Sequence, residues 1–154
     1  MPTQIVPPLD HGGPVGRAFD PFPDVALGAP LHQRFATMAA RYPDRVAAAD
    51  AVRRLTYAQL ARLAGRIAAA LAAARLPAGA PVGILLAHEA RFPAAMLAAS
   101  QAGHPFVPLD ATYPAERLAA IAADAGLAAV VSAGDLLGRA AALVPPGATV
   151  IDLT

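Results

Sequence analysis

The stretch QAGHPFVPLDATYPAERLAAI, residues 101–121, decides how this chain folds because it changes secondary structure twice within a short distance. Gly103 follows an alanine-rich helical pattern, and glycine tolerates the left-handed backbone that commonly ends a helix. The apolar residues Phe106 and Val107 then predict a strand. Pro114 fits the first turn of a new helix, where its missing N–H is not needed, and Glu116 suits the positive helix N-terminus. The stretch therefore predicts a helix, a strand and a second helix.

The same alternation extends outward in both directions. Short apolar runs predict strands at residues 46–49, 82–87, 106–107, 128–132 and 148–153. A turn is predicted at residues 50–54, which makes a hairpin of the first strand and the element that begins at residues 55–56. Helical spacing predicts helices at residues 31–42, 56–71, 89–102, 114–126 and 136–143. Strands that alternate with helices at this spacing favour an α/β fold, a mostly parallel sheet flanked by helices.

Residues 1–30 differ from the rest because they are rich in proline and glycine and show no periodicity. This composition is typical of an extended arm or linker. The 154 residues of the chain are enough for one domain with a hydrophobic core, and we assign that domain to residues 31–154.

The stretch LTYAQL, residues 55–60, predicts a helix start. Thr56 is a candidate N-cap, and Gln59, three residues later, can reach back to the backbone N–H of Thr56. Leu55 and Leu60 occupy the positions of a hydrophobic staple. Beyond this start the spacing predicts an apolar stripe that faces the core, made of Leu60, Leu63, Ile67 and Leu71. Arg62 and Arg66 are predicted to face away from it.

Charge and composition exclude several classes of protein. The net charge is +1, so no field of one sign attracts nucleic acid or an anionic membrane. Cysteine is absent, which excludes disulfides and thiolate metal sites. The first ten residues lack the basic and apolar regions of a signal peptide, and no apolar run is suited to crossing a membrane. We therefore expect a cytoplasmic protein.

Common nucleotide and metal motifs are missing. The sequence contains no lysine, so a Walker phosphate loop is excluded, and no glycine fingerprint follows the strand at 82–87. His88 and Glu89 begin like a zinc motif, but Phe92 stands where the second histidine would be. His11 and His32 are expected to be solvated. For His104, just after a helix end, we expect a structural role.

The remaining polar candidates also have structural interpretations. Ser100 and Ser132 are the two serines of the chain, and neither lies in a nucleophile motif. Asp110 follows a strand, where open α/β sheets often bind ligands, but capping of the next turn is favoured. Arg117 near a helix start could bind an anion, but a surface role or an ion pair is favoured. These residues yield no catalytic, cofactor-binding or metal-binding assignment.

Two motifs carry a resemblance to a known family. LTYAQL, and QAGHPFVPLD followed by ATYPAERL, resemble in the same order the first two core motifs of adenylate-forming ligases. The likeness is strongest to the amino-acid adenylation domains of nonribosomal peptide synthetases, and it extends from about residue 31 to residue 154. Gln59 and Gln101 replace the usual glutamate and lysine, and His104 and Phe106 also depart from the pattern.

The resemblance implies the N-terminal subdomain of an enzyme that activates a carboxylate with ATP and magnesium. The phosphate loop, substrate pocket and catalytic lysine of a complete domain match no position here, so we expect a truncated subdomain that is inactive alone. Its partner would be the remainder of the synthetase, or the chain would self-associate. The alternative is a non-catalytic scaffold or interaction module. A flavodoxin-like binder of a small ligand fits the alternation but not the motifs.

Overall fold

A four-stranded parallel sheet forms the centre of the molecule. The structure, a computed structural model, describes residues 28–146 and 148–154. The sheet order is β4-β3-β5-β6, and every neighbouring pair is parallel. The strands are β3 (Val82–Leu86), β4 (Phe106–Asp110), β5 (Ala129–Ser132) and β6 (Thr149–Asp152). All residues of β3 and β5 are buried, as expected of central strands covered on both faces.

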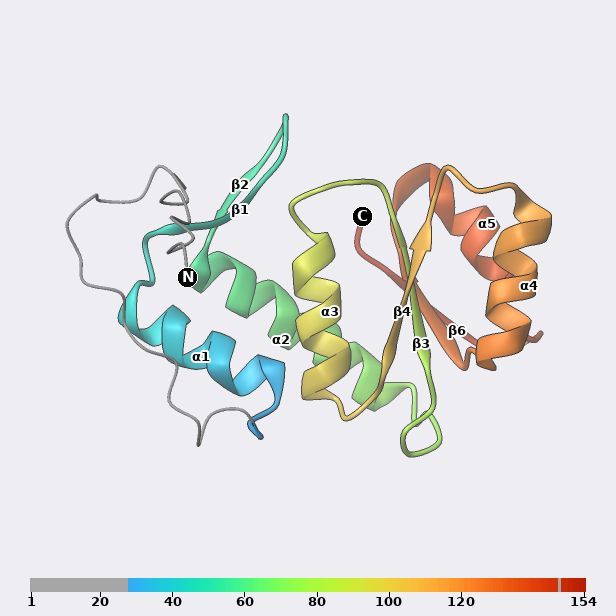
Figure 1. Cartoon of the computed structure of the whole chain (residues 1–154), viewed down its shortest axis with the longest axis horizontal. Helices are drawn as coiled ribbons and strands as arrows, with labels where there is room; N and C mark the ends of the chain where they lie inside the picture. Colours follow the sequence, from blue (N-terminus) through green and yellow to red (C-terminus); the bar gives the residue numbers. More distant parts are fainter. Residues whose placement is uncertain (1–27, 147) are drawn as a thin grey trace, which may run out of the picture.

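Helices cover both faces of this sheet (Figure 1). On one face lie α2 (Tyr57–Ala73) and α3 (Phe92–Gln101), and on the other lie α4 (Ala115–Ala125) and α5 (Leu137–Ala141). The connection from β3 to β4 runs along the sheet in the opposite direction to the connections from β4 to β5 and from β5 to β6. Crossovers of one handedness then require α3 on one face and both α4 and α5 on the other.

Successive residues of β3 supply two separate cores because side chains alternate across a strand. Ile84 packs with α2 and α3, and Leu85 packs with α4 and α5. The α2–α3 core contains many alanines, which let the two helices and the sheet approach closely (among them Ala64, Ala68, Ala94, Ala95, Ala98 and Ala99). The core thus follows from the composition, since small side chains fill it where aromatic residues are few and tryptophan is absent.

A helix and a hairpin lie outside the α2–α3 layer (Figure 1). The helix α1 (Leu31–Arg41) ends at Tyr42 as predicted and packs on α2 and α3. The hairpin pairs β1 (Val46–Ala49) with β2 (Arg54–Thr56) in antiparallel register. Phe35 of α1 stacks on Tyr57 at the start of α2, with ring centroids 5.5 Å apart.

The predicted capping box at the start of α2 is confirmed. The backbone N–H of Gln59 donates to Thr56 Oγ1 at 3.2 Å, and the N–H of Thr56 donates to Gln59 Oε1 at 2.8 Å. Arg62 and Arg66 are exposed, also as predicted. Gly103 has a φ of 79°, so the left-handed helix end predicted there is confirmed too.

Some predicted boundaries were wrong. β4 continues beyond residue 107 to Asp110, with Pro108 opposite Ile84 in the ladder. Proline is tolerated there because, in the described sheet, β4 pairs on one side only. The helix predicted from residue 89 begins at Phe92 with a proline in its first turn, and the last helix is shortened by a 3-10 turn at Gly134–Leu136. No helix in the described ranges is long and apolar enough to cross a membrane.

Candidate functional site

The carboxyl ends of β3 and β4 form the candidate site, because the following helices leave these two strands toward opposite faces of the sheet. Open α/β sheets bind ligands at such a position. A pocket of about 440 Å³ lies between these strand ends and the β1–β2 hairpin. It is lined by Ala49, Asp50, Leu86, Ala87, His88, Glu89, Phe92, Pro93, Pro108, Leu109 and Asp110.

Asp50 joins the hairpin to the sheet. Its Oδ1 accepts hydrogen bonds from the N–H groups of Val52 at 2.7 Å and Arg53 at 2.6 Å. Its Oδ2 accepts from the N–H of Ala90 at 2.7 Å, in the loop after β3. These backbone donors, of which the N–H of Ala90 has the largest effect, lower the pKa of Asp50 below its ordinary value. Both carboxylate oxygens therefore help to hold the turn predicted at 50–54 against the loop after β3.

Arg91 connects the same loop to the end of β6. Its Nε and Nη2 donate to both carboxylate oxygens of Glu89, the second at 3.0 Å, and its Nη1 donates to the Leu153 carbonyl at 2.6 Å. The hydrogen bonds to Glu89 are the main cause of the raised pKa of Arg91. Because Glu89 is occupied by Arg91, it does not form a ligand set with His88, and the zinc-like beginning of this motif has a structural explanation.

Asp110 and Asp152 end two parallel strands with the same turn. Asp110 accepts from the N–H of Thr112 at 2.9 Å and from its hydroxyl at 2.7 Å, and Asp152 accepts likewise from Thr154 at 2.8 and 2.6 Å. These bonds lower the pKa of both carboxyls. The favoured interpretation of Asp110 as a turn cap is confirmed, although Asp110 also lines the pocket.

Arg139 fixes the turn that follows β4. Its Nη1 donates to the Ala111 carbonyl at 2.7 Å and its Nη2 to the Tyr113 carbonyl at 2.6 Å. Arg117 lies over the Tyr113 ring, 4.0 Å from the centroid, which favours its surface role over anion binding. The sequence did not indicate the roles of Arg91 and Arg139, because their carbonyl acceptors are distant in the chain. The acceptor of Arg91 is 62 residues away, and the two acceptors of Arg139 are 28 and 26 residues away.

Among the histidines and serines that the structure describes, His88 lines this pocket and the others do not. His104 Nδ1 is 2.9 Å from the Ala80 carbonyl, a structural contact of the kind predicted. The prediction that His32 is solvated was wrong: the ring is half-buried, and its Nδ1 lies 3.0 Å from Ser100 Oγ because α1 packs on α3. Ser132 is buried and donates to the Leu85 carbonyl at 2.8 Å. His11 is outside the described residues.

The hydrogen bonds at this edge hold its loops and turns together. Its carboxylates accept hydrogen bonds from nearby backbone and side-chain donors, and its partly buried guanidinium groups donate to carboxylate and carbonyl oxygens. Within residues 28–146 and 148–154, no three histidine, aspartate or glutamate side chains converge as a metal site. The pocket offers a shaped and partly apolar surface, and its polar lining consists of His88 and the carboxylates of Asp50, Glu89 and Asp110.

Comparison with known proteins agrees with this architecture. Residues 35–152 match the family model described as "AMP-binding enzyme". A curated relative, one of the linear gramicidin synthase proteins of Brevibacillus parabrevis, is 41% identical over 101 residues, which cover 66% of this chain and 1% of the relative. The chain spans from 1% to 17% of the length of the first curated relatives it matches.

Two solved structures resemble the described fold. The nonribosomal peptide synthetase FmoA3, bound to AMPPNP, has a TM-score of 0.72 and 32% identity, with 80% of this chain and 13% of that chain covered. The N-terminal subdomain of Klebsiella oxytoca NpsA, in complex with anthranilyl-AMSN, has a TM-score of 0.66 and 28% identity, with 81% and 31% covered. The chain therefore belongs to the AMP-binding enzyme family and corresponds to the N-terminal part of a nonribosomal peptide synthetase adenylation domain.

Proposed function

We propose that residues 31–154 serve as the first structural part of a domain that activates an amino acid with ATP for nonribosomal peptide synthesis. The observation that carries the proposal is the match of residues 35–152 to the AMP-binding family, on a sheet like that of synthetase adenylation domains. The reaction uses ATP, and under this proposal it takes place in the cytoplasm.

In this reaction a carboxylate oxygen of the amino acid attacks the α-phosphorus of ATP. The bond to the bridging oxygen breaks, and pyrophosphate leaves as the acyl adenylate forms. Positive charge stabilises the transition state of such a transfer. The arginines at the carboxyl edge, Arg91 and Arg139, already donate to Glu89 and to backbone carbonyls, so we assign them to holding the framework. Magnesium accompanies ATP in complete family domains, and the described residues offer no set of ligands for it.

The proposal predicts that the chain alone does not form acyl adenylates. The measurement is amino-acid-dependent exchange of labelled pyrophosphate into ATP, over the common amino acids, with a blank that lacks protein. We expect no exchange above the blank, since the described residues supply neither a nucleotide-binding lysine nor a phosphate loop. Exchange by the pure chain would overturn this prediction.

A chimera tests the positive part of the proposal. Residues 31–154 replace the matching segment of an active adenylation domain from a curated relative, and the same domain without that segment is the control. We expect the chimera to catalyse exchange and the control to be inactive. A folded chimera without exchange would favour the alternative of a non-catalytic scaffold.

We also propose that the isolated chain self-associates. In the described sheet β6 pairs with β5 on one side only, so its other edge presents unpaired backbone groups. Such edges recruit further strands. Light scattering after size exclusion, over a hundredfold range of concentration, should show a mass that rises with concentration. A constant monomer mass would contradict this expectation.

A further inference from the structure

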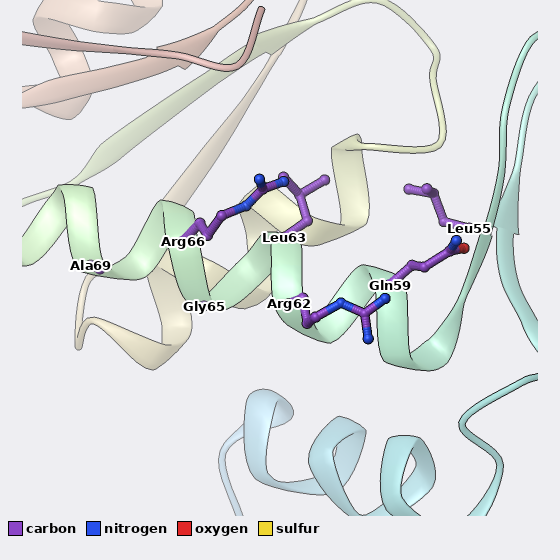
Figure 2. A pocket seen from close by; sticks show the side chains of 7 residues that line it. All are labelled: Leu55, Gln59, Arg62, Leu63, Gly65, Arg66 and Ala69. Atoms are coloured by element: carbon purple, nitrogen blue, oxygen red, sulfur yellow. The ribbon is translucent and has the colours of Figure 1, made fainter.

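A hollow of about 650 Å³ lies along the outer surface of α2, and the pocket at the carboxyl ends of β3 and β4 shares none of its lining residues (Figure 2). It is lined by Leu55, Gln59, Arg62, Leu63, Gly65, Arg66 and Ala69. All of these except Leu55 belong to a single helix, α2. Within residues 28–146 and 148–154, the hollow is therefore a helix face that no other element covers, bordered at one end by the β1–β2 hairpin.

The helical spacing of 100° per residue arranges this face in three strips. The apolar side chain of Leu63 lies on one side, Gly65 and Ala69 lie on the other, and Arg62 and Arg66 lie between them. Figure 2 shows both arginine side chains extending toward the first turn of the helix. The face thus combines a central pair of positive charges with an apolar margin and a margin of small residues.

Gly65 has no packing role within the described chain. A β-carbon added to it would meet no atom within 4 Å, apart from the backbone of its own helix. A glycine inside a helix costs roughly 0.5–1 kcal/mol relative to alanine. The small residues Gly65 and Ala69 are four positions apart. Small residues at this spacing are typical of helix faces on which a second helix packs with close backbone contact.

The two arginines lack acidic partners in the part of the chain that the structure describes. Neither arginine forms an ion pair with a described residue, whereas Arg53 and Arg91 both pair with Glu89. Arg62 and Arg66 are exposed, one helical turn apart, and project from a surface that is otherwise mostly apolar. A complementary surface would present two carboxylates one turn apart among apolar side chains, which describes an acidic amphipathic helix.

We propose that this face of α2 is the docking site of such a helix, supplied by the remainder of the synthetase. The assignment of this helix to the remainder of the synthetase rests on the proposed function. A second copy of this chain is a poorer match. Among the helices of the described residues, α4 carries the acidic residues Glu116 and Asp124, and these are two turns apart. A polyanion such as nucleic acid is also a poorer match, because two cations on an apolar surface provide little charge.

The probe is a synthetic alanine- and leucine-rich peptide of about 20 residues, long enough to form a helix in water, with two glutamates four positions apart. Matched peptides carry two glutamines or two lysines at these positions. Each peptide is titrated into the isotope-labelled chain, and the amide NMR shifts are followed. We expect the glutamate peptide to shift residues 55–69, and the glutamine peptide to bind more weakly.

Two sets of variants identify the groups responsible. The double substitution Arg62→Glu and Arg66→Glu should weaken binding of the glutamate peptide roughly tenfold, since two attractive charge pairs become repulsive. The same variant should bind the lysine peptide more tightly than the parent chain does, because the charges are then opposite. Arg75→Glu makes the same change of charge outside the hollow and should leave binding unchanged. Gly65→Leu should block the close approach of the peptide, and circular dichroism checks that this variant folds.

Three results would overturn the docking site. These are equal binding of the glutamate and glutamine peptides, shifts that map to the edge of β6 instead of α2, or binding that survives Gly65→Leu in a folded protein. The pyrophosphate exchange of the chimera is a separate readout. An active chimera together with any of these results removes the docking site and leaves the proposed function standing.

Discussion

Adding a single methyl group to Gly83 should destabilise this protein. Gly83 is the second residue of the buried strand β3. A β-carbon at this position would lie 2.8 Å from Leu127 Cδ1, 3.1 Å from Leu109 Cδ1 and 3.2 Å from Val130 Cγ2. All three distances are shorter than ordinary van der Waals contact. Because the three neighbours are themselves buried in the α4–α5 core, they have little room to move.

The magnitude follows from two opposing effects. Overpacking a dense core costs about 1–3 kcal/mol, because neighbouring side chains are forced from their preferred conformations. Replacing glycine also restricts the unfolded chain, which returns about 0.4–1 kcal/mol to the folded state. We therefore expect Gly83→Ala to lower the free energy of unfolding by about 1–2 kcal/mol.

The same substitution at Gly65 is the matched control. The added methyl group meets no neighbour there, and alanine favours the helix, so Gly65→Ala should raise the free energy of unfolding by about 0.5–1 kcal/mol. Urea denaturation of the two variants and the parent gives both changes in the free energy of unfolding, provided that its dependence on urea concentration has the same slope in all three proteins. The signs should be opposite.

A double-mutant cycle tests the cause. Leu127→Ala removes the methyl group that lies 2.8 Å from the new β-carbon, so Gly83→Ala should cost less in that background than in the parent. If Gly83→Ala is as stable as the parent, or if its cost is the same with and without Leu127, the argument from packing is refuted.

Two further predictions concern the helix cap and the hairpin. Thr56→Ala should lower the free energy of unfolding by about 0.5–2 kcal/mol, because the N–H of Gln59 loses its acceptor. Gln59→Ala should lower it by less. If chemical denaturation finds the stability of Thr56→Ala within error of the parent, the capping role of Thr56 is contradicted. Asp50 has a folded-state pKa below its ordinary value of 3.8, so its stabilisation is present above that value and is lost as the pH falls through the lower folded pKa. Asp50→Asn should therefore reduce the change in stability between pH 5 and pH 2, as measured by thermal denaturation, and an unchanged pH profile would count against this role.

The sequence by itself determined the order of the elements and several of their ends. These features depend on residues a few positions apart. The capping box at Thr56 and Gln59, the left-handed end at Gly103 and the strand–helix alternation are local in this sense. Pattern matching over two short motifs, together with this alternation, was also enough to identify the family.

The tertiary structure alone decided the strand order and the contacts that hold the carboxyl edge together. Asp50 contacts Ala90, Arg91 contacts Leu153, and His32 contacts Ser100, over separations of 40, 62 and 68 residues. A local pattern carries no information about a partner this distant, so it indicates only a turn residue at Asp50 and only a solvated side chain at His32. The two glycines show the same limit. The sequence does not indicate which of them is enclosed, but packing encloses Gly83 and leaves Gly65 open, because the contacts of a β-carbon depend on which elements the fold brings against it.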